Sequence, residues 1–285
     1  MPNFNVPNIV LSEGKFRKVN VLSLSSIAMG TGVSPQTEVD IPAYGDLVGL
    51  QLVLTQTTAG TLTGAKTLDY AIDGLAVKDK SGRPIWQRIR GVDLAFLERY
   101  LSGKGRSRTV PTTSGSSQTH SYYIPTNIEF KDMVARIQVS LAAYSAMATS
   151  GATGGTVSLD VIAYYVDKSN AQFTQRIQRT TQTIGAGTYR LGPILPKQVA
   201  IQHLLFKVGT ESNITSLLFS SDGRQELDDI TPTQLANMDD VVQTSGHVTG
   251  QFSLYNSPFV SDTKTIFDIQ GAGSDSVELF IVTAD

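Results

Sequence analysis

The fold is decided by two similar stretches, VSLDV at residues 157–161 and VELFI at residues 277–281. Each stretch begins with an apolar, a polar and an apolar residue in alternation, which is the pattern of a half-buried antiparallel strand. Both then become apolar on the second face as well, at Ile162 and Tyr164 in the first and at Phe280 and Val282 in the second. This change indicates an outward face covered by another domain or subunit, although a strand at the centre of a sandwich gives the same pattern.

Further segments match in the same order upstream of these two stretches. The matching pairs are residues 137–140 with 267–270, 121–124 with 251–254, an Asp-Gly hairpin turn at 73–74 with one at 222–223, and 42–54 with 196–208. The offset between matches falls steadily along the chain, so the first copy has longer loops, and such loops cost little closure entropy. The shared order predicts that the chain contains one domain twice.

The 285 residues suffice for two domains, and we place them at 1–170 and 171–285, joined near Asp167-Lys168-Ser169-Asn170. Each half contains seven or eight strand-like runs separated by turn residues, which suits a β-sandwich or jelly roll. One short helix is expected in each half. Residues 231–234, Thr-Pro-Thr-Gln, form a capping box, and Asp93 precedes an apolar stripe of Leu94, Leu97 and Leu101.

The residues indicate no catalytic centre, cofactor or metal. Cysteine is absent, which excludes disulfides and thiolate chemistry, and the three histidines show no metal-ligand spacing. His203 lies in an apolar strand and is interpreted as structural. The acids Asp228, Asp229, Asp239 and Asp240 are interpreted as solvated helix flanks in preference to a Ca²⁺ site.

Charge is sparse, and this limits the classes of partner. Charged residues make up 17% of the chain, against a usual ~25%, and the net charge of −2 provides no basic field for nucleic acid. Such a surface is typical of a protein that hides much of itself against neighbours, and also of a monomer with a neutral polar surface. Two small basic groups remain as candidate contacts: Lys15, Arg17 and Lys18 near the N-terminus, and Lys104, Arg106 and Arg108 in a loop of the first half.

The chain resembles the double jelly-roll major capsid proteins of tailless icosahedral viruses, the corticovirus-like phages in particular. The resemblance is carried by Leu195-Pro196 running into the strand 199–208, then Asp222-Gly223, the helix from Thr231, and the paired strands 265–270 and 276–282. It implies an all-β chain of two tandem jelly-roll β-sandwiches, with one short helix inserted in each.

The same resemblance implies a structural role without enzymatic activity. Three chains would form a homotrimer of six-sided outline that tiles an icosahedral shell, beside penton or minor capsid proteins and over an internal membrane in many such viruses. The protein would be made in the host cytoplasm and reside in the virion. Lys15, Arg17 and Lys18 would face inward, and Lys104, Arg106 and Arg108 would lie at the outer surface or between capsomers.

Two other functions remain open from the sequence. A β-sandwich can serve as a carbohydrate-binding or adhesin-like module, including a virion accessory protein, and such sites usually present exposed aromatic rings. The single tryptophan, Trp86, has no counterpart in the second half. A glycosidase with paired carboxylates is the third option, but no acid is flanked by a distinctive pattern.

Overall fold

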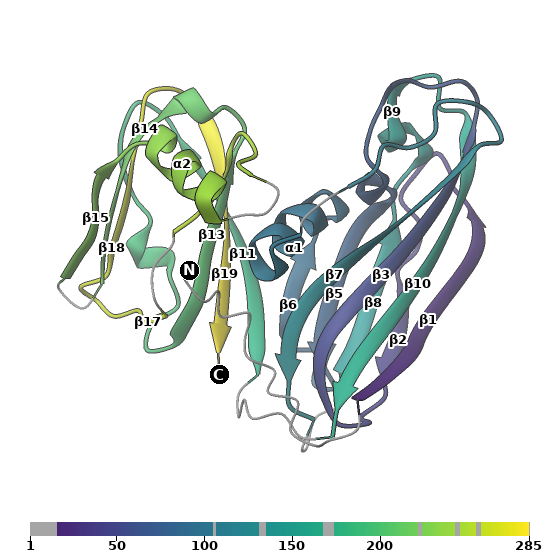
Figure 1. Cartoon of the computed structure of the whole chain (residues 1–285), viewed down its shortest axis with the longest axis horizontal. Helices are drawn as coiled ribbons and strands as arrows, with labels where there is room; N and C mark the ends of the chain where they lie inside the picture. The colour runs from purple at the N-terminus through teal and green to yellow at the C-terminus, as the bar shows by residue number, and fades with distance from the viewer. Residues whose placement is uncertain are drawn as a thin grey trace. The chain divides into compact units, whose positions relative to one another are not determined.

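A computed structural model describes residues 16–104, 107–130, 135–167, 174–221, 224–242, 246–254 and 258–284 (Figure 1). The chain divides into two compact units, Met1–Thr174 and Gln175–Asp285. The boundary predicted after Asn170 lies outside the described residues. Within the described ranges, none of the helices has the length and apolar character needed to cross a membrane.

In its described part, the first unit has eight main strands, which pair in two antiparallel groups of four. In chain order the strands are β1 (Phe16–Ala28), β2 (Thr37–Ile41), β3 (Asp46–Ala59), β5 (Ile72–Asp79), β6 (Pro84–Ile89), β7 (Ser117–Ile128), β8 (Ala135–Leu141) and β10 (Gly154–Val166). One sheet has the order β1-β10-β3-β7 and the other β2-β8-β5-β6. The short strands β4 (Thr63–Ala65) and β9 (Ala148–Ser150) pair separately.

The second unit repeats this topology strand for strand. Its strands are β11 (Gln175–Ile184), β12 (Gly187–Arg190), β13 (Ala200–Val208), β14 (Ile214–Ser221), β15 (Arg224–Ile230), β16 (Gln251–Ser253), β18 (Ile266–Gly271) and β19 (Asp275–Ala284), with β17 (Phe259–Val260) added beside β13. The sheets have the orders β11-β19-β13-β16 and β12-β18-β14-β15. In both units the first, eighth, third and sixth strands form one sheet, and the second, seventh, fourth and fifth form the other. This is the jelly-roll order.

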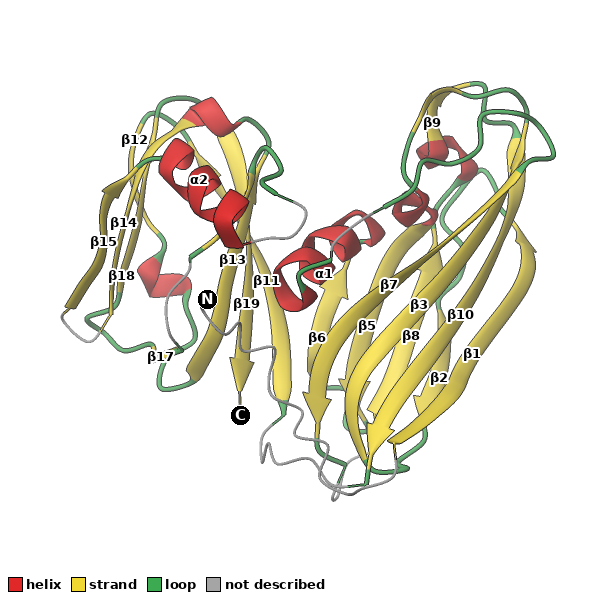
Figure 2. Cartoon of the chain, in the orientation of Figure 1, coloured by secondary structure: helices red, strands yellow, loops and turns green. Residues whose placement is uncertain are grey.

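The predicted duplication is confirmed by this correspondence. The matched stretches lie in equivalent strands, β10 with β19, β8 with β18, β7 with β16 and β3 with β13. The helices α1 (Leu94–Ser102) and α2 (Pro232–Val242) both stand between the fifth and sixth strands of their unit (Figure 2). Each sheet must bury its apolar face against the other sheet of its unit. Because the two units have the same strand order and the same alternation of apolar and polar residues, they pack in the same way.

The predicted hairpin turn at Asp73-Gly74 is wrong, and its proposed counterpart Asp222-Gly223 lies outside the described residues. Gly74 belongs to β5, and the turn to β6 is made instead by residues 80–83, where the Gly82 N–H donates to the Asp79 carbonyl at 3.0 Å. A Cβ at Gly74 would lie 2.4 Å from the Arg88 Nε. Glycine at this position therefore makes room for a neighbouring side chain rather than for a turn.

Each core lies between the two sheets of its unit. The stretch that decided the fold alternates as predicted, because Val157, Leu159 and Val161 are fully buried while Ser158 and Asp160 between them are partly exposed. In the second unit the core contains a group of phenylalanines, with the rings of Phe206 and Phe252 stacked at 4.9 Å. Aromatic pairs of this kind supply much of the apolar burial in a small sandwich.

The two helices share a position but are started by different interactions. The capping box of α2 is confirmed, because the Thr231 N–H donates to Gln234 Oε1 at 2.8 Å and the Gln234 N–H donates to Thr231 Oγ1 at 3.3 Å. Asp93 occupies the cap position of α1, but its carboxylate makes no capping bond and accepts two hydrogen bonds from Arg90, each of 3.2 Å. The predicted leucine stripe of α1 is buried.

Candidate functional site

The predicted inner-surface residues lie at the start of the edge strand β1. Lys15 is outside the described residues. The guanidinium of Arg17 lies 3.6 Å from the Asp167 carboxylate, and the Lys18 ammonium lies 5.9 Å from the centre of the Tyr164 ring. Both cations are exposed. Both contacts are made at the surface, so the two charges remain accessible to a partner.

The predicted outer loop follows α1. Lys104 and Arg108 are exposed, and Arg106 is outside the described residues. The end of the loop is anchored, because the Arg108 carbonyl accepts the Leu68 N–H at 2.8 Å, and Ser107 Oγ lies 2.5 Å from the Tyr122 hydroxyl. The described end of the loop is thus held by the fold, and only its charged side chains project.

A buried carboxyl group lies on the helix that this loop follows. Glu98 on α1 accepts the Tyr123 N–H at 2.8 Å and is almost wholly buried. Burial raises the pKa of Glu98, while this hydrogen bond and the positive charge of Lys104 oppose the increase. The bond joins α1 to β7 and therefore positions the start of the basic loop.

The outer face of the β2-β8-β5-β6 sheet carries charges that are paired along its strands. Arg136 on β8 donates to Asp40 at 2.8 Å and to Glu38 at 3.3 Å, both on β2, and Gln138 donates to Glu38 as well. These cross-strand pairs satisfy one another within the sheet. Lys78 of β5, opposite Arg136 in the register, adds a further cation to this face.

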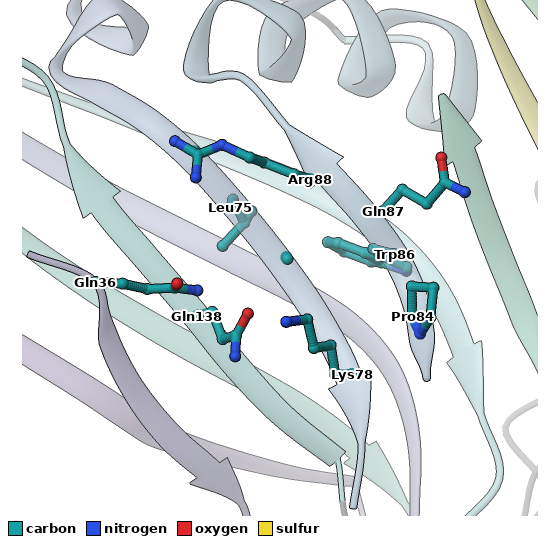
Figure 3. Close-up of a pocket in the computed structure, with 10 residues that line it drawn as sticks. Gln36, Leu75, Lys78, Pro84, Trp86, Gln87, Arg88 and Gln138 are labelled. Atoms are coloured by element: carbon teal, nitrogen blue, oxygen red, sulfur yellow. The ribbon is translucent and has the colours of Figure 1, made fainter. Parts of the chain in front are cut away.

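A hollow of about 150 Å³ lies on the same face (Figure 3). Its floor contains Gly74 and Ala76 of β5, and Arg88 reaches across Gly74 to bond Asp73 and, at 3.2 Å, Ser140. Trp86 lines the hollow but is fully buried. The hollow therefore lacks the exposed aromatic ring on which a sugar would stack.

The outer face of the other sheet, β1-β10-β3-β7, carries rows of hydroxyl groups. Thr55 and Thr119 face each other across β3 and β7 with their oxygens 2.7 Å apart, and Thr57 and Ser117 do so at 2.6 Å. Toward the other end of the strands, Tyr164 donates to Gln51 at 2.5 Å. This face therefore presents many hydrogen-bonding groups, together with the charges of Lys18 on β1 and Asp160 on β10.

The structure bears on His203 and on the acidic group that the sequence analysis considered. Burial lowers the pKa of His203 to about 4, so this imidazole is neutral at physiological pH. Among the residues that the structure describes, no group of three or more His, Asp and Glu side chains is arranged to hold a metal ion. The side chain of Asp228 is not described, so the acidic group of the sequence analysis is tested only at its other members.

Sequence reasoning missed one cluster, which is centred on His247. Its Nδ1 lies 3.0 Å from Asp239 Oδ2, and its Nε2 lies 3.2 Å from Glu211 Oε2. Asp239 was predicted to be a solvated helix flank, but it is fully buried. No local pattern could have revealed the cluster, since Glu211 stands far upstream, between β13 and β14.

Comparison with known proteins gives a likeness of structure without one of sequence. No family model matches the chain, and no curated protein matches it in sequence. Among solved structures, the STIV major capsid protein, from Sulfolobus Turreted Icosahedral Virus, is similar with a TM-score of 0.70 at 11% identity, over 95% of this chain and 97% of that chain. The chain has the double jelly-roll fold.

Two further capsid structures share this fold over nearly their whole length. The major capsid protein P2 from Bacteriophage PM2 has a TM-score of 0.63 at 12% identity, with 95% of this chain and 97% of that chain covered. The PBCV-1 virus capsid has a TM-score of 0.58 at 10% identity, with 95% and 93% covered. The predicted fold class, two tandem jelly-roll β-sandwiches with one short helix inserted in each, is confirmed.

Proposed function

We propose that the chain is a structural major capsid protein that assembles as homotrimers into an icosahedral virion shell. The observation that carries this proposal is the repetition of a complete jelly roll, with a helix at the same place in each unit, over the full length of capsid proteins of the same fold. Three chains with two such units each supply six similar blocks, from which a six-sided trimer can be built by cyclic symmetry.

The surface chemistry supports a role in self-association. The outer faces of the first unit carry rows of hydroxyl groups on one sheet and the Arg136, Asp40 and Glu38 charges on the other. These groups already have partners within their sheet, which lowers the cost of burying them. Permanent interfaces commonly bury more than ~2,000 Å². Sheet faces of this kind provide a large area for contact.

The two basic groups suggest which side of the chain faces the interior of the shell. Lys15, Arg17 and Lys18 would face the interior, where an internal membrane presents anionic headgroups, while Lys104, Arg106 and Arg108 would lie outside or between capsomers. Penton and minor capsid proteins would be further partners, and the protein would be made in the host cytoplasm. Non-enzymatic function and the lack of specific nucleic-acid binding belong to the same proposal.

The alternative of a carbohydrate-binding or adhesin module receives no support from the aromatic residues. Its sequence argument depended on an exposed ring, and Trp86 is fully buried. Among the other large apolar side chains, Tyr44 is the exposed aromatic of the described residues, and its ring packs edge-on against Tyr165 at 6.0 Å. A lone tyrosine held in this way offers a poor platform for a sugar.

The test is the solution mass of the purified protein by light scattering, with negative-stain imaging of the same sample. We expect three times the 30.6 kDa chain mass and a six-sided outline, or closed shells. A monomer that persists at high concentration would refute the proposal.

The direction of the basic groups is tested on assembled particles with an amine-reactive, membrane-impermeant label and mass spectrometry. Lys104 should be labelled on intact particles, and Lys18 only after dissociation, which serves as the matched control. Equal labelling of both lysines on intact particles would contradict the inward placement.

A further inference from the structure

His247 joins three separate parts of the second unit. It lies between α2 and β16, and its ring contacts Asp239 on α2 and Glu211 on the short 3-10 helix Glu211–Asn213 (η5), which connects β13 to β14. Its backbone N–H donates to Asp240 Oδ1 at 2.8 Å, and the Gly250 N–H donates to Glu211 Oε2 at 2.9 Å. The cluster thus ties the chain between the fifth and sixth strands to the turn between the third and fourth.

The geometry of the ring requires a particular protonation state. Both ring nitrogens face a carboxylate oxygen at hydrogen-bonding distance, and a carboxylate can only accept. A neutral imidazole carries one N–H, so one of its nitrogens would then point a lone pair at a carboxylate. Only the doubly protonated imidazolium satisfies both partners.

The charges around His247 are mostly negative. Asp239 and Asp240 come from α2 and Glu211 from η5, while Lys207 on β13 lies beside Gln251 of β16 in the sheet register. Burial lowers the pKa of His247, but its bonds to Asp239 and Glu211 outweigh burial and raise the pKa above its ordinary value. Loss of the proton therefore leaves several carboxylates close together without the cation between them.

A second link at the same end of the unit provides an internal comparison. Asp275, at the start of β19, accepts the Thr210 N–H at 2.7 Å and the Asn213 Nδ2–H at 3.1 Å. Burial opposes ionisation of Asp275, but the hydrogen bonds that it accepts lower its pKa. This link keeps its charge from mildly acidic to alkaline pH, and so it does not respond in the range where His247 titrates.

We propose that His247 is a proton-operated latch, which ties residues 246–250 to η5 while the imidazole is charged and releases them when it loses its proton. The latch is closed from mildly acidic pH up to the pKa of the folded state and opens above it. The Asp275 link stays closed, so the release is confined to residues 246–250. All of the residues that form the latch belong to the second jelly roll.

The test is amide hydrogen exchange of the full-length protein between pH 6 and 9, compared at each pH with the variant His247→Gln after every rate has been divided by the intrinsic rate of that amide in its own sequence. At pH 6 the amides of His247 and Gly250 should exchange at least about tenfold more slowly in the wild type, since both depend on bonds to charged groups. This ratio should fall toward one as the pH rises, while the amides of Thr210 and Asn213 stay protected.

A second variant separates the latch from a purely structural role. Glu211→Gln removes one carboxylate at a partly exposed position, so the pH at which protection is lost should move down, and the His247 resonance in NMR titration should move with it. The proposal is overturned if the exchange ratio is constant from pH 6 to 9, or if Glu211→Gln leaves the midpoint unchanged.

Discussion

Substitution by alanine at three glycines of the first unit should lower its stability to different extents. The loss should be greatest at Gly91, smaller at Gly82 and smallest at Gly32. A Cβ at Gly91 would lie 1.9 Å from the Asp69 carbonyl oxygen and 2.5 Å from the Ile72 carbonyl oxygen. Carbon–oxygen contacts normally begin near 3.3 Å, so the backbone would have to move by more than about 1 Å. Overpacking of this kind costs about 3 kcal/mol or more.

The other two positions isolate the separate contributions. Gly82 has a φ of +85°, and no atom lies within 4 Å of the added Cβ, so its alanine variant suffers backbone strain alone. The alanine also reduces the entropy of the unfolded chain, which offsets part of the strain. The net loss of unfolding free energy should be about 1 kcal/mol. Gly32 has neither a positive φ nor a close neighbour, and its variant should be neutral within about 0.5 kcal/mol.

The assay is urea unfolding followed by the fluorescence of Trp86. This is the only tryptophan in the chain, and it is fully buried in β6, so its emission reports on the first unit. In thermal unfolding of a unit of this size, the same loss of 3 kcal/mol would lower the Tm by about 6–12 °C. An unfolding midpoint for Gly91→Ala equal to wild type, or higher than that of Gly82→Ala, would refute the reasoning.

Three further outcomes follow from the second unit. Thr231→Ala should lose about 1 kcal/mol of unfolding free energy, because it removes one half of the capping box of α2; an unchanged urea midpoint would contradict this. Phe219→Ala should lose about 3–5 kcal/mol, whereas Val260→Ala at a half-exposed position should change little, as measured by thermal unfolding. Asp275→Asn should be destabilising at pH 7, and its difference in unfolding free energy from wild type should shrink below pH ~4. The pKa of Asp275 is lower in the folded than in the unfolded protein. Its charge therefore stabilises the fold fully above the unfolded-state pKa, and this stabilisation is lost as the pH falls through the folded-state pKa. A pH-independent difference in urea titrations would argue against the last.

The duplication could be predicted because it depends on local patterns. Residues close together in the sequence determine which face of a strand is apolar, and they also form the capping box at Thr231. The order of these patterns along the chain is the same in both copies, although the loops between them differ in length. The same reasoning failed at Asp73-Gly74, where a pair typical of turns lies inside a strand and glycine serves the packing of Arg88. A local sequence pattern indicates which backbone conformations a residue can adopt. It does not indicate whether the folded protein places that residue in a turn or in a strand.

The cap of α1 shows the same limit on a finer scale. Asp93 was predicted at the right position, yet its carboxylate bonds Arg90 instead of the helix N–H groups. Both roles suit an aspartate before a helix. The choice between them depends on where the preceding strand β6 places the guanidinium.

The sequence by itself determined the fold class, the two copies, the helix in each and the lack of thiol chemistry, because each of these depends on composition or on residues close together in the chain. Only the tertiary structure decided which side chains meet. The pairing of Arg136 with Asp40 follows from the register of β2 against β8, and the contact of His247 with Glu211 follows from the way in which a jelly roll brings distant turns to one end. Side-chain chemistry at such places is set by long-range strand order, which leaves no trace in local sequence.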